Sequence, residues 1–242
     1  MLSELGFSSE NIIAKNAILP VIYYRYNYGP EAFKDDTSNK VRLEIRKYLV
    51  ISQLRRIFGQ AANTALGAIR TELQKHKNDK FQFAFLQQLS FAGEKALQFK
   101  AEDIDGWFDD YEKSAYTFMI LTLLYPHLRY SQNAFHQDHM HPYAAFDEGL
   151  DKLQLPNGQV MTDEKIKQWQ HKRNTLANLQ ILEGRENSSK NATPLIEWLQ
   201  DPANKQNVKY LPPNIDYSLE NFDEFMEKRQ KWMADELKKI LL

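Results

Sequence analysis

Histidines concentrate in one part of the chain, where one of them directly follows an acidic residue. Five of the six histidines lie between positions 127 and 171. The densest stretch reads Phe135-His-Gln-Asp-His-Met-His-Pro142, with Asp138 and His139 side by side. A neutral imidazole accepts protons and binds metal ions, and a carboxylate is an oxygen ligand for hard cations. This stretch is therefore the first candidate for a catalytic or metal-binding site.

The segments that follow have the pattern of a strand and then a helical turn. Residues 178–184 read Asn-Leu-Gln-Ile-Leu-Glu-Gly, an apolar strand pattern closed by glycine, and Arg-Glu-Asn-Ser-Ser-Lys-Asn follows at 185–191. We expect Pro142 to end an earlier strand that carries the acidic residue and the histidine. Thr193-Pro194 then predicts a short helix through Leu199, with threonine as the N-cap and proline in the first turn.

The spacing of these residues resembles a known nuclease motif. Asp138-His139-x-x-Pro142, followed by Asn178 and by Asn187 nine residues later, is similar to the HNH (ββα-metal) motif in the variant with asparagine in the third position. The HNH domain of RNA-guided CRISPR nucleases is also similar. The longer string over 135–199 more closely resembles the C-terminal nuclease region of GmrSD-type, modification-dependent restriction proteins.

Two flanking segments are similar to helices of those restriction proteins. They are the apolar segment at 18–24 and the segment at 222–241 with its spaced apolar residues. Proteins of this type carry an upstream nucleotide-dependent domain, and nothing in this sequence resembles its motifs. The resemblance therefore implies either the nuclease half of a longer protein or a stand-alone relative. It also implies an upstream nucleotide-dependent domain or subunit as a possible partner, and we do not extend nucleotide binding to this chain.

The resemblance implies a role for each motif residue. Phosphodiester hydrolysis needs a water, a base that takes its proton, and a cation that stabilises negative charge. His139 is the expected general base, and the side-chain carbonyl of Asn178 is expected to fix its tautomer. Asp138 and Asn187 are the expected metal ligands, and their oxygens suit Mg²⁺ or Mn²⁺.

Each of these roles has an ordinary structural alternative. Asp138 and His139 can be a turn acid and a surface histidine. Asn178 can be a turn residue, and Asn187 can cap the next helix. The complete spacing favours the nuclease roles over these alternatives.

Other residues near the motif have less specific roles. His136, His139 and His141 can together bind zinc, which we keep as a minor alternative. We expect Trp169 and Trp198 to be core residues. Four basic residues flank the motif and either contact DNA phosphates or remain solvated surface charges: Lys172, Arg173, Arg185 and Lys190.

Composition limits the class of protein. The chain has 242 residues, 43% of them apolar, and a net charge of −1, so a folded core is expected and a general DNA-coating protein is not. Cysteine is absent, which excludes disulfides and thiolate metal sites and indicates a reducing compartment. No signal sequence begins the chain, and the longest apolar run, at 118–125, is too short to cross a bilayer. We predict a cytoplasmic protein without membrane contact.

The fold is predicted to be α+β, mostly helical with a small ββα-metal (HNH) nuclease module. Helical spacing covers 12–28 (a buried helix from near Pro20 to Gly29-Pro30), 39–58, 63–75, 81–89 with a competing strand pattern, and 101–125. Thr162 is expected to cap a helix, and 201–218 to be irregular. The expected domains are a helical domain at 1–130, the nuclease module at 131–200, and at 201–242 a connection and a C-terminal helix that packs back on the helical domain.

The sequence thus predicts a metal-dependent HNH endonuclease that hydrolyses DNA and acts as the effector part of a restriction or anti-phage defence protein. One alternative is a docking or DNA-binding module that cuts only when joined by the upstream nucleotide-dependent domain. Another is an RNA-cleaving nuclease, because the same phosphate chemistry serves both nucleic acids.

Overall fold

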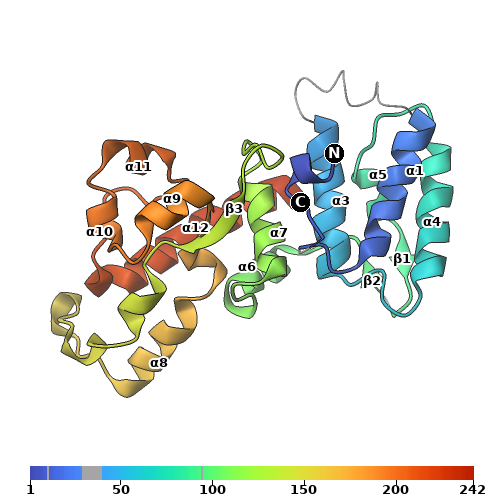
Figure 1. The fold of residues 1–242 in the computed structure, drawn as a ribbon. Coiled ribbons are helices and arrows are strands. Elements are labelled where there is room, and N and C mark those ends of the chain that lie inside the picture. The colour runs from blue at the N-terminus through green and yellow to red at the C-terminus, as the bar shows by residue number, and fades with distance from the viewer. Residues whose placement is uncertain (10, 29–39, 94) are drawn as a thin grey trace. The chain divides into compact units, whose positions relative to one another are not determined.

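The computed structural model describes residues 1–9, 11–28, 40–93 and 95–242, which are mostly helical with two small antiparallel sheets (Figure 1). The predicted α+β class is confirmed at this level. The chain forms two compact units, one of 1–100, 125–131 and Leu241, the other of 101–124, 132–240 and Leu242. Residues 101–124, which we expected in the N-terminal helical domain, thus belong to the second unit. No helix in the described ranges has both the length and the apolar character needed to cross a membrane.

The first unit contains helices in the segments at 12–28, 39–58, 63–75 and 81–89 that the sequence predicts to be helical, and it also contains a short helix, η1 (Ser3–Leu5), and two strands that the sequence does not predict. The helices in the predicted segments are η2 (Lys15–Ala17), α1 (Ile18–Tyr28), α3 (Lys40–Leu54), α4 (Ala62–Lys75) and α5 (Ala84–Gln87), and strand β1 (Ser90–Phe91) pairs with β2 (Lys95–Ala96). The helix predicted at 81–89 is shortened to α5. Its first backbone N–H groups bond to side chains instead, since Phe81 N donates to Tyr24 Oη and Phe83 N donates to Glu44 Oε2, each at 2.8 Å.

Helix α1 is buried on one face rather than on all sides. Val21 and Tyr24 are buried, whereas Leu19, Ile22 and Tyr26 are exposed. The predicted buried helix is therefore present, but only one face of its described part is buried. Its predicted stop at Gly29-Pro30 lies outside the described residues.

In the second unit, the single helix predicted at 101–125 is broken. The structure has α6 (Ala101–Asp110) and α7 (Ala115–Leu124), separated by residues 111–114, which we call the α6–α7 loop. Asp109 and Asp110 end α6, where negative charge opposes the helix dipole. Ser114 starts α7, because its hydroxyl accepts from the backbone N–H of Thr117 at 3.4 Å.

Two strands and a helix follow the order of the predicted motif. Strand β3 (Phe135–His139) pairs antiparallel with β4 (Leu179–Glu183), so that Asp138 lies opposite Gln180. Helix α9 (Gly184–Lys190) continues directly from β4 and contacts both strands (Figure 1).

Between the two strands lie short helices and α8. They are η3 (Tyr143–Phe146), η4 (Leu150–Lys152), η5 (Pro156–Gly158), α8 (Asp163–Lys172) and η6 (Leu176–Asn178). Thr162 caps α8 as predicted, because its hydroxyl accepts from Lys165 N at 3.3 Å. The strand predicted from position 178 begins one residue later, because Asn178 ends η6.

After α9 the chain forms α10 (Leu195–Trp198), α11 (Pro202–Asn207), η7 (Leu219–Asn221) and α12 (Phe222–Leu241). The N-cap of α10 is Pro194, so the predicted Thr193 cap is wrong by one residue. The region expected to be irregular contains α11, whose first turn is capped by Asp201 through a hydrogen bond from Ala203 N at 2.8 Å.

Helix α12 contributes to the core of the second unit. Phe222 packs edge-on against Phe146 and Trp169, with ring centroids 4.7 and 5.2 Å apart. Trp169 and Trp198 are buried, as predicted. The buried Arg229 donates from Nη1 to the carbonyls of Ala177 and Leu179 at 2.6 and 3.0 Å. These bonds fix α12 to the segment on both sides of Asn178.

Candidate active site

Three of the four motif residues line one cavity in the second unit. Asp138 and His139 reach it from the end of β3, and Asn187 reaches it from α9. Tyr143 and Lys113, from η3 and the α6–α7 loop, line it as well. The cavity has a volume of about 420 Å³. Residues that are 48 positions apart in the sequence thus share one space, because α9 follows β4 directly and β4 pairs with β3.

Asp138 is held by a buried ion pair and a hydrogen bond, both on the same oxygen. Its Oδ2 lies 3.0 Å from Lys190 Nζ and accepts from Gln180 Nε2 at 2.9 Å. Lys190 is fully buried and also donates to the carbonyl of His139. Burial lowers the pKa of Lys190, and the Asp138 carboxylate opposes that shift. In the described part of the chain, no hydrogen-bond partner reaches the second oxygen, Oδ1, which leaves it for another ligand.

The ring of His139 is oriented by Asn174 and Glu112. His139 Nε2 lies 3.1 Å from Asn174 Oδ1, and Asn174 Nδ2 donates to Glu112 Oε2 at 3.2 Å. An ionised carboxylate only accepts hydrogen bonds, so Glu112 fixes which end of the Asn174 amide faces the ring. The amide oxygen requires a donor, and Nε2 therefore carries the proton. The lone pair of His139 is then on Nδ1.

The electrostatic surroundings of His139 favour the neutral ring. Burial lowers its pKa most, and the positive charges of Lys113 and Lys190 lower it further. The hydrogen bond with Asn174 and the charge of Asp138 raise the pKa, but the net shift is downward. At neutral pH the ring is uncharged and able to accept a proton.

We expect alanine at Asn174 to lower the rate of DNA cleavage by about 10- to 100-fold, the usual effect of losing a partner that orients a site residue. Because the hydrogen bond with Asn174 raises the pKa of His139, its loss lowers that pKa. A base works when deprotonated, so the acid limb of the pH–rate profile should move to lower pH.

Asn133→Ala is the matched control for this substitution, since Asn133 Nδ2 also donates to a glutamate, Glu183 Oε2 at 3.2 Å, without contacting His139. The control should keep both the rate and the pH profile. A slower Asn174→Ala variant with an unmoved acid limb would limit Asn174 to a structural role.

Asn178 does not contact His139, and the predicted orienting role is wrong in this structure. Its buried amide accepts from His141 N at 2.9 Å and donates to the carbonyls of His141 and Arg173 at 3.0 and 2.7 Å. All three bonds go to backbone groups, so the amide is fully used in fixing the turn that follows β3. The residue that orients the ring, Asn174, lies four positions earlier.

The side chain of Asn187 lines the cavity and caps none of the described helices. The described residues offer its amide no hydrogen bond, and Pro194 rather than Asn187 is the N-cap of α10. The backbone carbonyl of Asn187 accepts from Asn191 N at 3.0 Å, which ends α9. The helix-cap alternative is therefore wrong for this side chain, which remains available at the cavity.

The oxygens at the cavity fit a hard divalent cation, although they are few. Asp138 Oδ1 and the amide oxygen of Asn187 are the types of ligand that Mg²⁺ and Mn²⁺ prefer. Over residues 1–9, 11–28, 40–93 and 95–242, no three His, Cys, Asp or Glu side chains gather as a metal site. Mg²⁺ commonly binds through one or two carboxylates, several waters and substrate phosphates. The donor set suits a cation whose coordination a phosphate completes.

The three histidines proposed as a zinc alternative do not converge. His136 is exposed and does not line the cavity that His139 lines. His141 turns into the core, where its ring packs edge-on against Phe222 and Phe225 at 5.4 and 4.7 Å. The zinc interpretation is therefore wrong.

The buried ring of His141 predicts a loss of stability in acid. Burial lowers its pKa from the ordinary 6.5 to about 3, and its Nε2 has no hydrogen-bond partner among the described residues. The unfolded chain therefore binds a proton more readily than the native protein as pH falls from about 6.5 towards about 3. The free energy of unfolding should fall by about 2 kcal/mol between pH 7.5 and pH 5.

Urea unfolding at these two pH values measures the effect. His141→Leu removes the titrating group and should reduce the pH dependence by about 2 kcal/mol. An equal pH dependence in the variant would show that other groups cause the acid sensitivity.

Of the four basic residues proposed to contact DNA, three are paired with an acidic residue or line a different cavity. Lys190 is buried on Asp138, so the proposed phosphate contact is wrong for it. Arg173 Nη1 pairs with Asp147 at 2.6 Å, and its guanidinium lies 3.6 Å from the ring centre of Tyr143. Arg185 is exposed on the first turn of α9, and its contact with a DNA phosphate stays a prediction.

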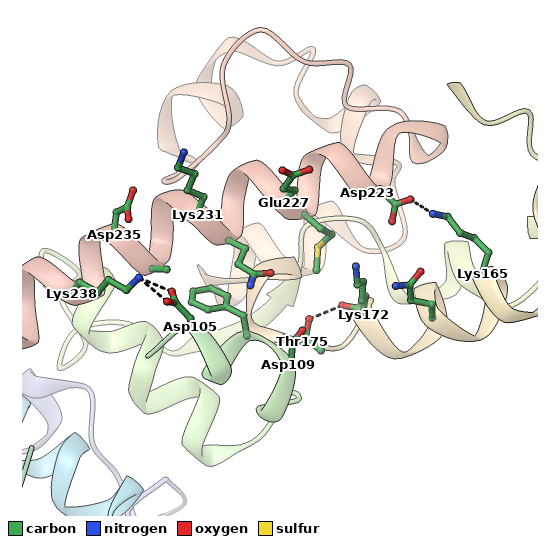
Figure 2. A pocket seen from close by; sticks show the side chains of 15 residues that line it. Asp105, Asp109, Lys165, Lys172, Thr175, Asp223, Glu227, Lys231, Asp235 and Lys238 are labelled. Carbon is green, nitrogen blue, oxygen red and sulfur yellow. Dashed lines mark hydrogen bonds and ion pairs between the residues drawn. The ribbon is translucent and has the colours of Figure 1, made fainter. Parts of the chain in front are cut away.

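Lys172, the fourth basic residue, lines a different cavity, of about 710 Å³, between α6, α8 and α12 (Figure 2). Two ion pairs cross it, Lys165 with Asp223 and Lys238 with Asp105. Its lining includes five carboxylate residues and four lysines. This balance does not favour a nucleic-acid backbone, which requires an excess of positive charge.

Comparison with models of known protein families gave no match, and no curated protein matches the chain either. The nuclease interpretation therefore depends on the motif residues and on the geometry described above.

Proposed function

We propose that the chain is a metal-dependent endonuclease of the HNH type that hydrolyses DNA phosphodiester bonds. The observation that carries this proposal is the common cavity of Asp138, His139 and Asn187. The strand, strand and helix that deliver these residues have the order expected for a ββα module. Support also comes from the neutral state of His139, which a general base requires.

In this proposal each residue has a distinct task. His139 accepts the proton of the attacking water on Nδ1, while Asn174 keeps the proton on Nε2. Asp138 Oδ1 and the Asn187 amide oxygen would hold a divalent cation, and Lys190 and Gln180 keep the Asp138 carboxylate oriented. A bound Mg²⁺ or Mn²⁺ would stabilise negative charge on the phosphate and on the leaving oxygen.

The biological setting follows from the resemblance alone. We propose that the chain is the effector part of a restriction or anti-phage defence protein, and that an upstream nucleotide-dependent domain is its partner. If the chain cleaves DNA only after that domain is added, the chain is the alternative docking module, which is active only in the assembled protein.

The test is cleavage of supercoiled plasmid and of labelled RNA with Mg²⁺ or Mn²⁺, each beside a reaction with EDTA. We expect nicked and linear DNA that EDTA abolishes, with RNA intact. The inactive control is Asp138→Asn combined with Lys190→Met, which removes both charges of the buried pair together and so leaves no unpaired charge. Cleavage by the control at the wild-type rate, or no cleavage of DNA in any reaction, would contradict the proposal.

A further inference from the structure

Lys113, which no motif includes, presents a positive charge at the candidate active site. It belongs to the α6–α7 loop and lines the same cavity as Asp138, His139 and Asn187. Among the described residues, no carboxylate lies within 4 Å of its ammonium group. Lys190 already neutralises Asp138 at 3.0 Å. Among the described residues that line the cavity, Lys113 is the one lysine or arginine, and its ammonium group is not engaged in an ion pair.

The backbone on both sides of Lys113 is fixed to the site. Lys113 N donates to the carbonyl of Asn174 at 2.8 Å, and Glu112 pairs with Thr175 in a β-bridge. The carbonyl of Ser114 accepts from Gln137 Nε2 at 2.9 Å. The backbone that carries Lys113 is therefore held by Asn174, which contacts His139, and by Gln137, which precedes Asp138.

Electrostatic coupling agrees with this position. Lys113 lowers the pKa of His139, and Asp138 raises the pKa of Lys113 against the stronger lowering caused by loss of surrounding water. Both effects agree with the geometry, in which Lys113 lines the same cavity as Asp138 and His139. A lysine ammonium without an anionic partner can donate a charge-assisted hydrogen bond to a phosphate oxygen.

We propose that Lys113 binds a non-bridging oxygen of the nucleic-acid phosphate at this cavity. The assignment rests on the proposed nuclease function for the identity of the substrate. The α6–α7 loop then supplies two parts of the site from outside the ββα module: Glu112 orients the base through Asn174, and Lys113 positions the phosphate. A phosphodiester of either DNA or RNA presents the required oxygen.

The test measures binding of a fluorescent duplex and of a single-stranded RNA at several salt concentrations. A His139→Ala background with Mg²⁺ keeps both probes intact. Lys113→Gln should reduce the slope of log K against log salt by about 0.9 for the duplex, which corresponds to about eightfold weaker binding at 0.1 M salt. Lys113→Arg keeps the charge and should keep both quantities. Lys231→Gln, in the cavity of Figure 2, is the control and should change neither.

The outcomes separate this inference from the nuclease proposal. An unchanged slope in Lys113→Gln, or no binding of either probe by the parent protein, would overturn the assignment of Lys113. A reduced slope in a protein that never cleaves would leave the phosphate site in place and reject the nuclease. Because Lys113 is exposed, the substitution should not affect folding, which thermal unfolding of each variant checks.

Discussion

Alanine in place of His139 is expected to slow single-turnover cleavage of DNA by about 10²- to 10⁴-fold, the usual contribution of a general base. The physical reason is the loss of the proton acceptor beside the phosphate, since the ring is neutral and its proton is fixed on Nε2. The residual rate should lose its acid limb, because the group that titrates there is gone. Quench measurements with saturating enzyme separate this chemical step from product release.

His136→Ala is the matched control for that substitution. His136 lies on the same strand, but it is exposed. We expect this variant to cleave at the wild-type rate. Equal rates for His139→Ala and His136→Ala would exclude His139 as the base.

Methionine in place of Lys190 is expected to lower the free energy of unfolding by roughly 3–5 kcal/mol, the typical cost of breaking a buried ion pair. The substitution leaves the nearly buried Asp138 carboxylate with Gln180 alone and removes the hydrogen bond to the His139 carbonyl. A loss of this size is a large part of the stability of an ordinary domain. Urea unfolding at pH 7.5 measures it, and Lys231→Met, at an exposed position, should change stability by less than about 0.5 kcal/mol.

The combination of Asp138→Asn and Lys190→Met should recover most of that loss, because neither partner then remains charged and unpaired. This recovery distinguishes the ion pair from the packing of the lysine stem. A double variant no more stable than Lys190→Met, or a single variant as stable as wild type, would show that the pair contributes little.

The sequence allowed part of the site to be predicted, because the motif lies in contiguous elements. Asp138 and His139 end one strand, and Asn187 follows the next strand within a turn of helix. Local pattern and the pairing of adjacent strands suffice to bring such residues together. The resemblance also predicts that Asn178 orients the ring of His139, but its side chain bonds to the backbone of His141 instead.

Residues of the α6–α7 loop could not be found in this way. Apolar spacing continues across 101–125, so periodicity alone predicts one helix. The loop also pairs with a distant segment, through the bridge between Glu112 and Thr175, and no local pattern predicts such a contact. A local signal was present in the acidic end of α6 followed by Ser114, which favours a helix start at that position. That signal predicts that Glu112 and Lys113 lie in a loop between two helices.

Lys190 illustrates a different difficulty. Lysine is almost never fully buried without a partner, so the sequence predicts that Lys190 lies at the surface, as a phosphate contact or a solvated charge. The residue is buried because α9 lies across both strands and Asp138 supplies the counter-charge. Tertiary packing determines which lysine near a motif forms a buried ion pair, and residue spacing in the sequence does not predict it.

The central claim, that the cavity of Asp138, His139 and Asn187 cuts nucleic acid with a bound cation, is tested most directly at Asn187. Its side chain makes no hydrogen bond with the described residues, so Asn187→Ala should leave the unfolding temperature unchanged. The measurement is the Mg²⁺-dependent rate of plasmid nicking by this variant beside Glu186→Ala, an exposed neighbour on α9. We expect a large loss of nicking in Asn187→Ala and wild-type nicking in Glu186→Ala, whereas equal nicking by the two variants would contradict the claim.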